Sequence, residues 1–308
     1  MTIARPPRPD TIRGTMDFGL CLPNFRDGAS PEAIEAAAEV TERLGWSTVW
    51  TTDHVLVPQE HAETYGNVYD AILTLAWVGA RHPGLRLGTS VIVVPQRNAV
   101  LLAKELATLD SLSGGRVIAG VGVGWNRVEF GNLAAEDRFH VRGAYLEETI
   151  RLWRHLWSGS TEPFRGRFHV IEDYVFGPLP IQGANLPIVI GADVERALKR
   201  TGALADGYHS SSVGPIDYAA RLPILRAAAE AAARPMPWLS ARVSVEFDGT
   251  PTTEYAMRGG PEAIAAEIKA FGDLGVTHLA LWFGSDPARL VTAAERFSRE
   301  VEPLVAGA

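Results

Sequence analysis

The chain has 308 residues, of which 46% are apolar, a composition that supports a large buried core and argues against disorder. Asp and Glu outnumber Lys and Arg by 36 to 29, the formal net charge is −7 and no basic block occurs, so we expect no nucleic-acid partner. The apolar runs are too short for the ~20 residues that a membrane-spanning helix needs, and a single cysteine, Cys21, fits a reducing compartment. We therefore expect a soluble, cytoplasmic protein.

Residues 1–15 hold three prolines and three arginines with almost no apolar content, a composition typical of a disordered or extended tail. Ordered structure should begin near Met16, which is itself a candidate for the native start of the protein. We expect residues 16–308 to form a single domain, because the chain from Met16 onward follows one repeating pattern.

This pattern alternates β-rich segments with segments of helical periodicity. Ser30 and Asn98 stand where helix N-caps are expected, and Gly45 and Gly114 stand where helices end. The first half of the chain is thus predicted to contain strands at 16–22, 46–52, 86–94 and 116–122, with helices over 30–45, 69–81, 98–114 and 140–158.

Residues 160–185 break the alternation with aromatic residues and prolines. We predict that they form an insertion after the fourth helix, with a hairpin around Arg165-Gly166. The alternation then resumes, with strands predicted at 187–191, 206–211, 240–247 and 277–283, and helices at 193–204, at 215–233, from Pro261 and from Pro287. About eight strand–helix pairs predict an α/β fold with a parallel sheet, closed into a TIM (β/α)8 barrel.

A barrel of this kind carries its active site on the loops that follow the strands. Asp53-His54 directly follows the second predicted strand. A histidine at this place could exchange protons near neutral pH, while the adjacent carboxylate orients its surroundings. The alternative is a surface histidine that follows a buried strand.

Glycines recur after the fourth predicted strand, in the pattern Gly120-x-Gly122-x-Gly124-Trp125. The pattern is not the dinucleotide-binding fingerprint, because Trp125 occupies the position of the third glycine. It fits the close approach of a flat or charged ligand to the backbone, and it equally fits a tight turn.

A third motif, Ile190-Gly191-Ala192, ends the fifth predicted strand and opens a helix. The unpaired N–H groups of a helix N-terminus form a site for an anion. An ordinary strand-to-helix turn would have a similar sequence.

Several common catalytic motifs are absent. No P-loop, H-E-x-x-H or G-x-S-x-G occurs and the histidines are scattered, so we expect no metal site. Glu129 and Glu246 lack a spacing that favours a glycosidase pair, and we expect solvated or helix-capping roles for both. The residues alone indicate a barrel enzyme without naming its reaction.

Several stretches together resemble the bacterial luciferase-like superfamily and, within it, the F420-dependent oxidoreductases. The most specific is the run KELATLDSLSGGR over 104–116, followed by the glycine pattern and Glu129. Shorter stretches that also match are 20–24 (LCLPN), 50–54 (WTTDH), 187–191 (PIVIG) and 205–208 (ADGY).

The resemblance implies a TIM barrel that holds a flavin-type ring at the strand ends. The cofactor it implies is the 8-hydroxy-5-deazaflavin coenzyme F420, with FMN as the alternative. It implies that His54 serves proton transfer or stabilises the cofactor anion, and that Asp53 contacts the ring. It also implies a cis peptide bond between Ser90 and Val91, in a bulge behind the ring.

Other site residues follow from the same resemblance. Gly191 and Ala192 match the backbone that receives the phosphate side of the cofactor. Gly122 and Gly124 complete the expected cofactor-binding set, and the expected walls of the substrate pocket are Asn24, Trp125 and Trp282. For the two tryptophans, simple packing at the barrel mouth is the alternative.

Two departures separate the chain from the sugar-phosphate dehydrogenases of this superfamily. Trp125 stands where they carry a catalytic glutamate, and Pro58 stands where they have a tryptophan four residues after the histidine. We therefore do not expect glucose-6-phosphate activity, and we expect a more apolar pocket.

Our prediction is an oxidoreductase that transfers a hydride between F420 and a small organic substrate, with His54 assisting proton transfer. One alternative is an FMN-dependent luciferase-like monooxygenase. Another is a non-catalytic flavin-binding protein, which the retention of Asp53-His54 disfavours. The resemblance also implies a homodimer.

Overall fold

Parallel strands close into a barrel in the computed structural model, which describes residues 16–247 and 254–306. The tail expected over 1–15 lies outside the described residues. The barrel consists of β1 (Asp17–Cys21), β2 (Thr48–Thr51), β3 (Arg86–Thr89), β5 (Val117–Gly122), β8 (Ile188–Ile190), β9 (Gly207–Ser211), β10 (Trp238–Glu246) and β12 (His278–Trp282). Because β12 pairs with both β10 and β1, these eight strands of the described chain form the closed ring of a TIM barrel, as the sequence predicts.

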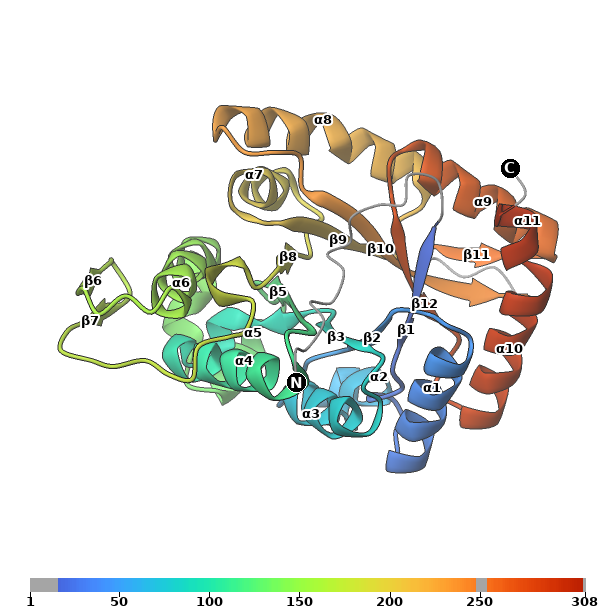
Figure 1. Ribbon diagram of the computed structural model, residues 1–308, viewed down its shortest axis with the longest axis horizontal. Helices are drawn as coiled ribbons and strands as arrows, with labels where there is room; N and C mark the ends of the chain where they lie inside the picture. Colours follow the sequence, from blue (N-terminus) through green and yellow to red (C-terminus); the bar gives the residue numbers. More distant parts are fainter. Residues whose placement is uncertain (1–15, 248–253, 307–308) are drawn as a thin grey trace.

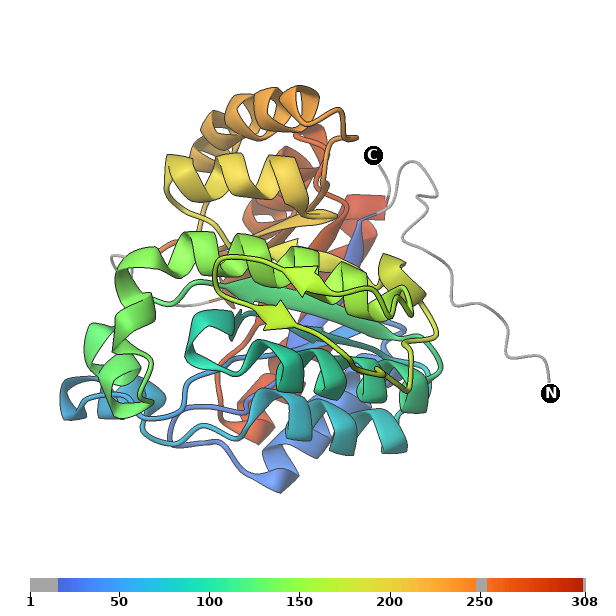
Figure 2. The same ribbon diagram turned by 90° about the vertical axis from the view of Figure 1, so that its left-hand side faces the viewer.

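Helices surround the strands (Figures 1 and 2). The long ones are α1 (Pro31–Arg43), α3 (Ala71–Arg81), α4 (Ala99–Ser113), α6 (Arg142–Trp157), α7 (Glu195–Leu204), α8 (Pro215–Ala231), α9 (Pro261–Asp273) and α10 (Pro287–Glu300). Short helices are α2 (Ala62–Tyr65), α5 (Arg127–Asn132), α11 (Glu302–Ala306) and the 3-10 turns η1 (Gln59–His61), η2 (Val94–Gln96), η3 (Glu136–Val141) and η4 (Gly183–Asn185). Within the described ranges, no helix is long and apolar enough to cross a membrane.

The helix ends follow the predicted capping residues. The Ser30 side chain accepts a hydrogen bond of 3.1 Å from the N–H of Ala33, which satisfies an N–H group that α1 leaves unpaired. Asn98 caps α4 in the same way, and Gly114 ends α4 with a φ of 76°, a left-handed conformation that glycine adopts without a steric penalty.

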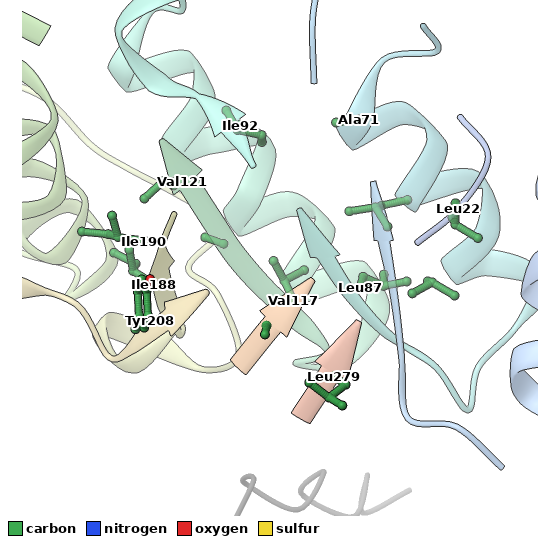
Figure 3. Close-up of a cluster of buried hydrophobic side chains, with 14 of the residues drawn as sticks. Leu22, Ala71, Leu87, Ile92, Val117, Val121, Ile188, Ile190, Tyr208 and Leu279 are labelled. Carbon is green, nitrogen blue, oxygen red and sulfur yellow. The ribbon is translucent and has the colours of Figure 1, made fainter. Parts of the chain in front are cut away.

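Strand residues divide alternately between two layers of core, as the period of two in a strand requires. Val117 and Leu279 belong to the large cluster that also includes helix side chains, and Figure 3 shows both among their neighbours. The next residues along the two strands, Ile118 and Ala280, belong instead to a separate cluster that fills the barrel. The core therefore lies both inside the ring and between the ring and its helices.

The strand predicted over 86–94 is interrupted. β3 ends at Thr89, the Ser90–Val91 peptide bond is cis, as the resemblance implies, and β4 (Ile92–Val93) then pairs with β5. The continuous apolar run had suggested a single strand, because periodicity does not register a break in backbone direction.

The predicted insertion forms a small antiparallel hairpin, β6 (Phe164–Arg165) with β7 (Val170–Ile171), between α6 and β8. The carboxylate of Glu148 on α6 holds the turn, since it accepts backbone hydrogen bonds of 2.7–2.8 Å from residues 167–169. One further strand, β11 (Ala256–Arg258), pairs in parallel with β10 beside the ring and was not predicted.

Candidate active site

The predicted site residues gather at one end of the barrel, because they all follow the C-terminal ends of parallel strands or end them. Asp53 and His54 follow β2, Gly122 ends β5, and Gly191 follows β8. We call this end of the barrel the mouth.

His54 is held by Glu129, a residue of the short helix α5. The Nδ1 atom of His54 lies 2.9 Å from Oε2 of Glu129. The other carboxylate oxygen accepts a hydrogen bond of 2.7 Å from the N–H of Val55, and Gln96 donates to Oε2 at 3.2 Å. Glu129 is only 1% exposed, so the solvated role expected for it is wrong.

The charge of Glu129 determines how His54 can act. Burial raises the pKa of the Glu129 carboxyl, but the hydrogen bonds from His54 and Val55 outweigh burial and lower this pKa below its usual value. An ionised carboxylate only accepts hydrogen bonds, so the hydrogen of a neutral His54 ring must be on Nδ1. This leaves Nε2, which has no hydrogen-bond partner in the described part of the chain, as the atom that can take up or release a proton.

Asp53 makes a different set of contacts. Its carboxylate accepts from the N–H of Val93 at 3.0 Å and from Arg97 at 2.6 Å, and Arg97 also reaches Asp70 at 3.1 Å. Burial opposes the charge of Arg97, but the two carboxylates prevail and raise the pKa of this side chain. With 3% of its surface exposed, Asp53 ties the end of β2 to the segment after the strand break.

Glycines make room for that strand break. A Cβ on Gly120 would lie 1.6 Å from the carbonyl oxygen of Thr89, and one on Gly122 would lie 2.6 Å from the Val91 side chain. Gly191 faces Val91 from β8, where a Cβ would approach to 3.2 Å. Two positions on β5 and one directly after β8 are thus occupied by glycine for a direct packing reason, in addition to any ligand. Gly124, with a φ of 72°, turns the chain after β5.

Ser90 is joined to a buried histidine that the sequence did not single out. Its Oγ lies 3.0 Å from Nε2 of His209, whose Nδ1 lies 2.8 Å from Oγ of Ser240. The His209 ring stacks on Trp50 at 4.5 Å. Burial, followed by the charges of His278 and Arg242, lowers the pKa of His209 to about 3, so this ring is neutral and serves to position Ser90.

Aromatic rings line the mouth in a continuous series that we call the aromatic arc: Trp125, His54, Tyr65, Phe25 and Trp282. Ring centroids are 6.0 Å apart for Trp125 and His54, 4.1 Å for His54 and Tyr65, 6.1 Å for Tyr65 and Phe25, and 4.7 Å for Phe25 and Trp282. Trp282 also lines a cavity of about 440 Å³ between the ends of β10, β11 and β12. The two tryptophans expected as pocket walls therefore stand at opposite ends of one arc that includes His54.

The segment from Gly191 to α7 carries few side-chain caps. Val194, at the N-cap position of α7, provides no side-chain hydrogen bond to the helix N-terminus. The carbonyl of Ala192 accepts from the hydroxyl of Tyr208 and from Arg221, which fixes the loop. Among the described residues, no side chain caps the N-terminal N–H groups of α7.

Asn24, expected in the pocket wall, lies behind it. Its side-chain amide donates to the carbonyls of Thr52 and Tyr69, and its amide oxygen accepts from the N–H of Thr52. Since Asn24 is fully buried, its role here is to tie the loop after β1 to the end of β2. Among the described residues, no group of three or more His, Cys, Asp or Glu side chains could hold a metal ion.

Comparisons with known proteins identify a family and similar folds. Residues 16–258 match the family described as luciferase-like monooxygenase. The F420-dependent glucose-6-phosphate dehydrogenase of Kineococcus radiotolerans is 28% identical over 90% of this chain and 94% of its own length.

Two solved structures show the same fold. An F420-dependent secondary alcohol dehydrogenase, in complex with an F420-acetone adduct, matches with a TM-score of 0.80 and 18% identity over 94% of this chain and 99% of its own. The second is a type II Baeyer–Villiger monooxygenase in complex with FMN, the oxygenating constituent of 3,6-diketocamphane monooxygenase from Pseudomonas putida. It matches with a TM-score of 0.78 and 13% identity, over 94% of this chain and 98% of its own.

Proposed function

Because the chain belongs to the luciferase-like monooxygenase family, we propose that it is an oxidoreductase that transfers a hydride between coenzyme F420 and a small organic substrate. The similarity to an F420-dependent dehydrogenase over nearly the whole chain supports the choice of cofactor. The observation that carries the proposal is the His54–Glu129 pair at the barrel mouth, because it leaves one ring nitrogen available for proton transfer.

The residues at the mouth fit a flavin-type ring with a phosphate-bearing side chain. Val91 is half-buried at the strand break, with Gly122 and Gly191 beside it, and offers a surface against which a flat ring can rest. The uncapped N-terminus of α7, next to Ala192, suits a phosphate group. When bound, F420 supplies the ring carbon C5 that donates or accepts the hydride.

The protein supplies proton transfer and orientation. Glu129 holds the Nδ1–H of His54, so that Nε2 takes up or releases the proton that accompanies oxidation or reduction of the substrate. Arg97 holds Asp53 and thereby fixes the loop that carries His54. The aromatic arc, which includes Trp125 and Trp282, excludes water from the reacting groups.

Titration of the purified protein with F420 and, in parallel, with FMN tests the cofactor, with binding followed by fluorescence. We expect binding of F420. Turnover is then followed by the absorbance of F420 with a panel of small alcohols and ketones. His54→Ala should lower kcat by about 10²- to 10⁴-fold with little change in F420 affinity. Wild-type turnover in this variant would refute the role of His54.

An FMN-dependent monooxygenase is the second candidate, supported by the similar fold of the FMN-bound enzyme from Pseudomonas putida. Tight binding of FMN together with no binding of F420 would favour it. A non-catalytic flavin-binding protein would bind either cofactor without turnover of any substrate in the panel.

We also propose that the protein is a cytoplasmic homodimer. The apolar side chains that α3 and α4 expose support the dimer: Leu73 and Trp77 on α3 are 71% and 39% exposed, and Leu101 on α4 is 57% exposed. The buried free thiol of Cys21 suits a reducing compartment.

A further inference from the structure

Arg242 extends from β10 across the barrel mouth and has no ion-pair partner among the residues that the structure describes. Its Nη1 donates hydrogen bonds of 3.0 Å to Oγ1 of Thr52 and to the carbonyl oxygen of Ser90. Both acceptors are uncharged. No carboxylate within 16–247 or 254–306 pairs with this guanidinium, and its other two nitrogens make no hydrogen bond to those residues. Arg242 is nevertheless half-buried.

Two other arginines near the mouth are neutralised. Arg97 pairs with Asp53 and Asp70, and Arg258 pairs with Glu246 at 2.7 Å. By contrast, the titratable groups whose pKa values are shifted by the charge of Arg242 are neutral near pH 7.

These groups are Cys21 and His209. Burial raises the pKa of the Cys21 thiol, and this effect is larger than the opposing effect of the Arg242 charge. Burial lowers the pKa of His209, and the Arg242 charge lowers it further. The positive charge of Arg242 is therefore uncompensated in a partly desolvated place, which is costly unless a ligand supplies the opposite charge.

Two rings of the aromatic arc flank this charge. The guanidinium carbon of Arg242 lies 5.4 Å from the ring centroid of Phe25 and 6.0 Å from that of Trp282. Apolar rings exclude water and so strengthen the attraction between the guanidinium and an anion. Trp282 connects this place with the cavity of about 440 Å³, which has room for the rest of a small molecule.

We propose that Arg242 binds an oxyanion group of the substrate, a carboxylate or a phosphate, while the apolar part of the substrate lies against Phe25 and Trp282. A planar guanidinium with free N–H groups suits such groups. This inference rests on the proposed function only in taking the barrel mouth as the active site. It narrows the substrate from a small organic molecule to an anionic one.

A second arginine provides an internal comparison. The guanidinium carbon of Arg26 lies 5.7 Å from the ring centroid of Phe25, and Arg26 lines the same cavity, but it is exposed on the loop after β1. Because water screens an exposed charge, Arg26 should contribute little to anion binding.

Binding is tested with four probes by calorimetry, first on the cofactor-free protein and then with F420 present. Benzoate is compared with benzamide, its neutral counterpart, and phenyl phosphate with phenol. We expect at least one anion to bind at least tenfold more tightly than its neutral counterpart, and the stronger anion identifies the kind of oxyanion. Equal binding within both pairs to the folded wild-type protein would overturn the proposal without need of any variant.

The residue is then tested by substitution. Arg242→Gln should abolish the preference for the anion, and Arg242→Lys should retain part of it. Arg26→Gln and Arg43→Gln, the latter on the outer helix α1 in a pair with Glu295, should leave the preference unchanged. If Arg26→Gln loses the preference for the anion while Arg242→Gln retains it, the assignment of the anion site to Arg242 is wrong.

The cofactor titration separates this inference from the proposed function. If F420 binds but neither anion is preferred, the inference fails and the proposed function stands. If an anion is preferred but F420 does not bind, the proposed function fails and the anion site stands. If Arg242→Gln weakens F420 binding and leaves the anion preference intact, Arg242 serves the cofactor and the inference is wrong.

Discussion

Glu129 determines which nitrogen of His54 is available at the barrel mouth. The carboxylate is buried, accepts hydrogen bonds from His54, Val55 and Gln96, and keeps its charge because these donors outweigh the cost of burial. A residue that orients a proton-transferring histidine influences the reaction without touching the substrate.

Glu129→Gln should therefore reduce kcat by about 10- to 100-fold and leave F420 affinity nearly unchanged. A neutral amide can donate as well as accept, so it no longer forces the hydrogen of His54 onto Nδ1. Nitrogen-15 NMR of the His54 ring should show the Nδ1–H form in the wild type and a mixture in the variant. Glu136→Gln, in an exposed pair with Arg127, is the control and should change neither property.

Stability against pH gives a second measurement on the same variant. The pKa of Glu129 is lowered in the folded protein, so its contribution to the free energy of unfolding is present above the unfolded pKa of about 4.3 and is lost as pH falls through the folded value. The stability difference between wild type and Glu129→Gln should thus narrow on acidification. A difference that stays constant down to pH 3 would contradict the ionised state of Glu129.

Individual site residues were predictable only where a motif marked them. Asp53-His54 follows a strand directly, so its place at the mouth could be predicted. Glu129 stands in a short helix with no apolar periodicity, and its partner His54 is far away in the sequence, so the pattern alone did not distinguish it from a solvated glutamate. The family resemblance includes Glu129 but did not assign it this role. Arg242 lies among the polar residues of a strand that alternates polar and apolar side chains, and this pattern does not reveal whether it faces a carboxylate or an open mouth.

At the scale of secondary-structure elements, the strands β3, β4 and β5 meet in a close backbone contact. The hydroxyl of Thr89 accepts a hydrogen bond of 2.9 Å from the N–H of Gly120. The same hydroxyl donates a hydrogen bond of 2.7 Å to the carbonyl oxygen of Gly120. The absence of a side chain on Gly120 allows the two backbones to approach this closely.

Gly120→Ala should destabilise the protein by at least about 3 kcal/mol, because a methyl group would collide with the backbone of Thr89, which cannot move aside as a side chain could. Gly131→Ala on α5 is the matched control. A Cβ there meets no atom within 4 Å, so the substitution should be neutral or should stabilise by up to about 1 kcal/mol. Urea unfolding of the two variants measures both effects, and equal stabilities would refute the packing argument.

The elements themselves were largely predictable, since local signals specify them. Ser30 and Asn98 cap helices through their own side chains, and strand periodicity marked the eight barrel strands. β11 was missed because its three residues are too few to show a period. The break after Thr89 came from the family resemblance and not from the pattern, because residues 86–94 are compatible with one β-rich segment and periodicity does not mark a break within it.

For the whole molecule, α3 and α4 present the surface that we expect to form the dimer. These helices pack against each other and expose Leu73 and Leu101. A stable interface must bury about 1,200–2,000 Å² of total surface, so neighbouring residues of both helices would take part.

Replacing Leu73 and Leu101 together by lysine should convert the protein to a monomer, because burying two like charges in each half of a symmetric interface is unfavourable. Sedimentation velocity measures the change. Val175→Lys is the control, since Val175 is 92% exposed in the segment after the hairpin and should not affect association. A wild-type protein that sediments as a monomer would refute the proposed dimer.

Closure of the ring by β12 also has a consequence for biosynthesis. Phe25, which follows the first strand, stacks on Trp282, which ends the last one, and β1 has no partner on one side until β12 reaches it. A ribosome releases the chain from the N-terminus onward, so β1 must wait with an exposed edge until nearly all of the protein has been made. The mouth, and any ligand that it binds, can therefore be completed only near the end of translation.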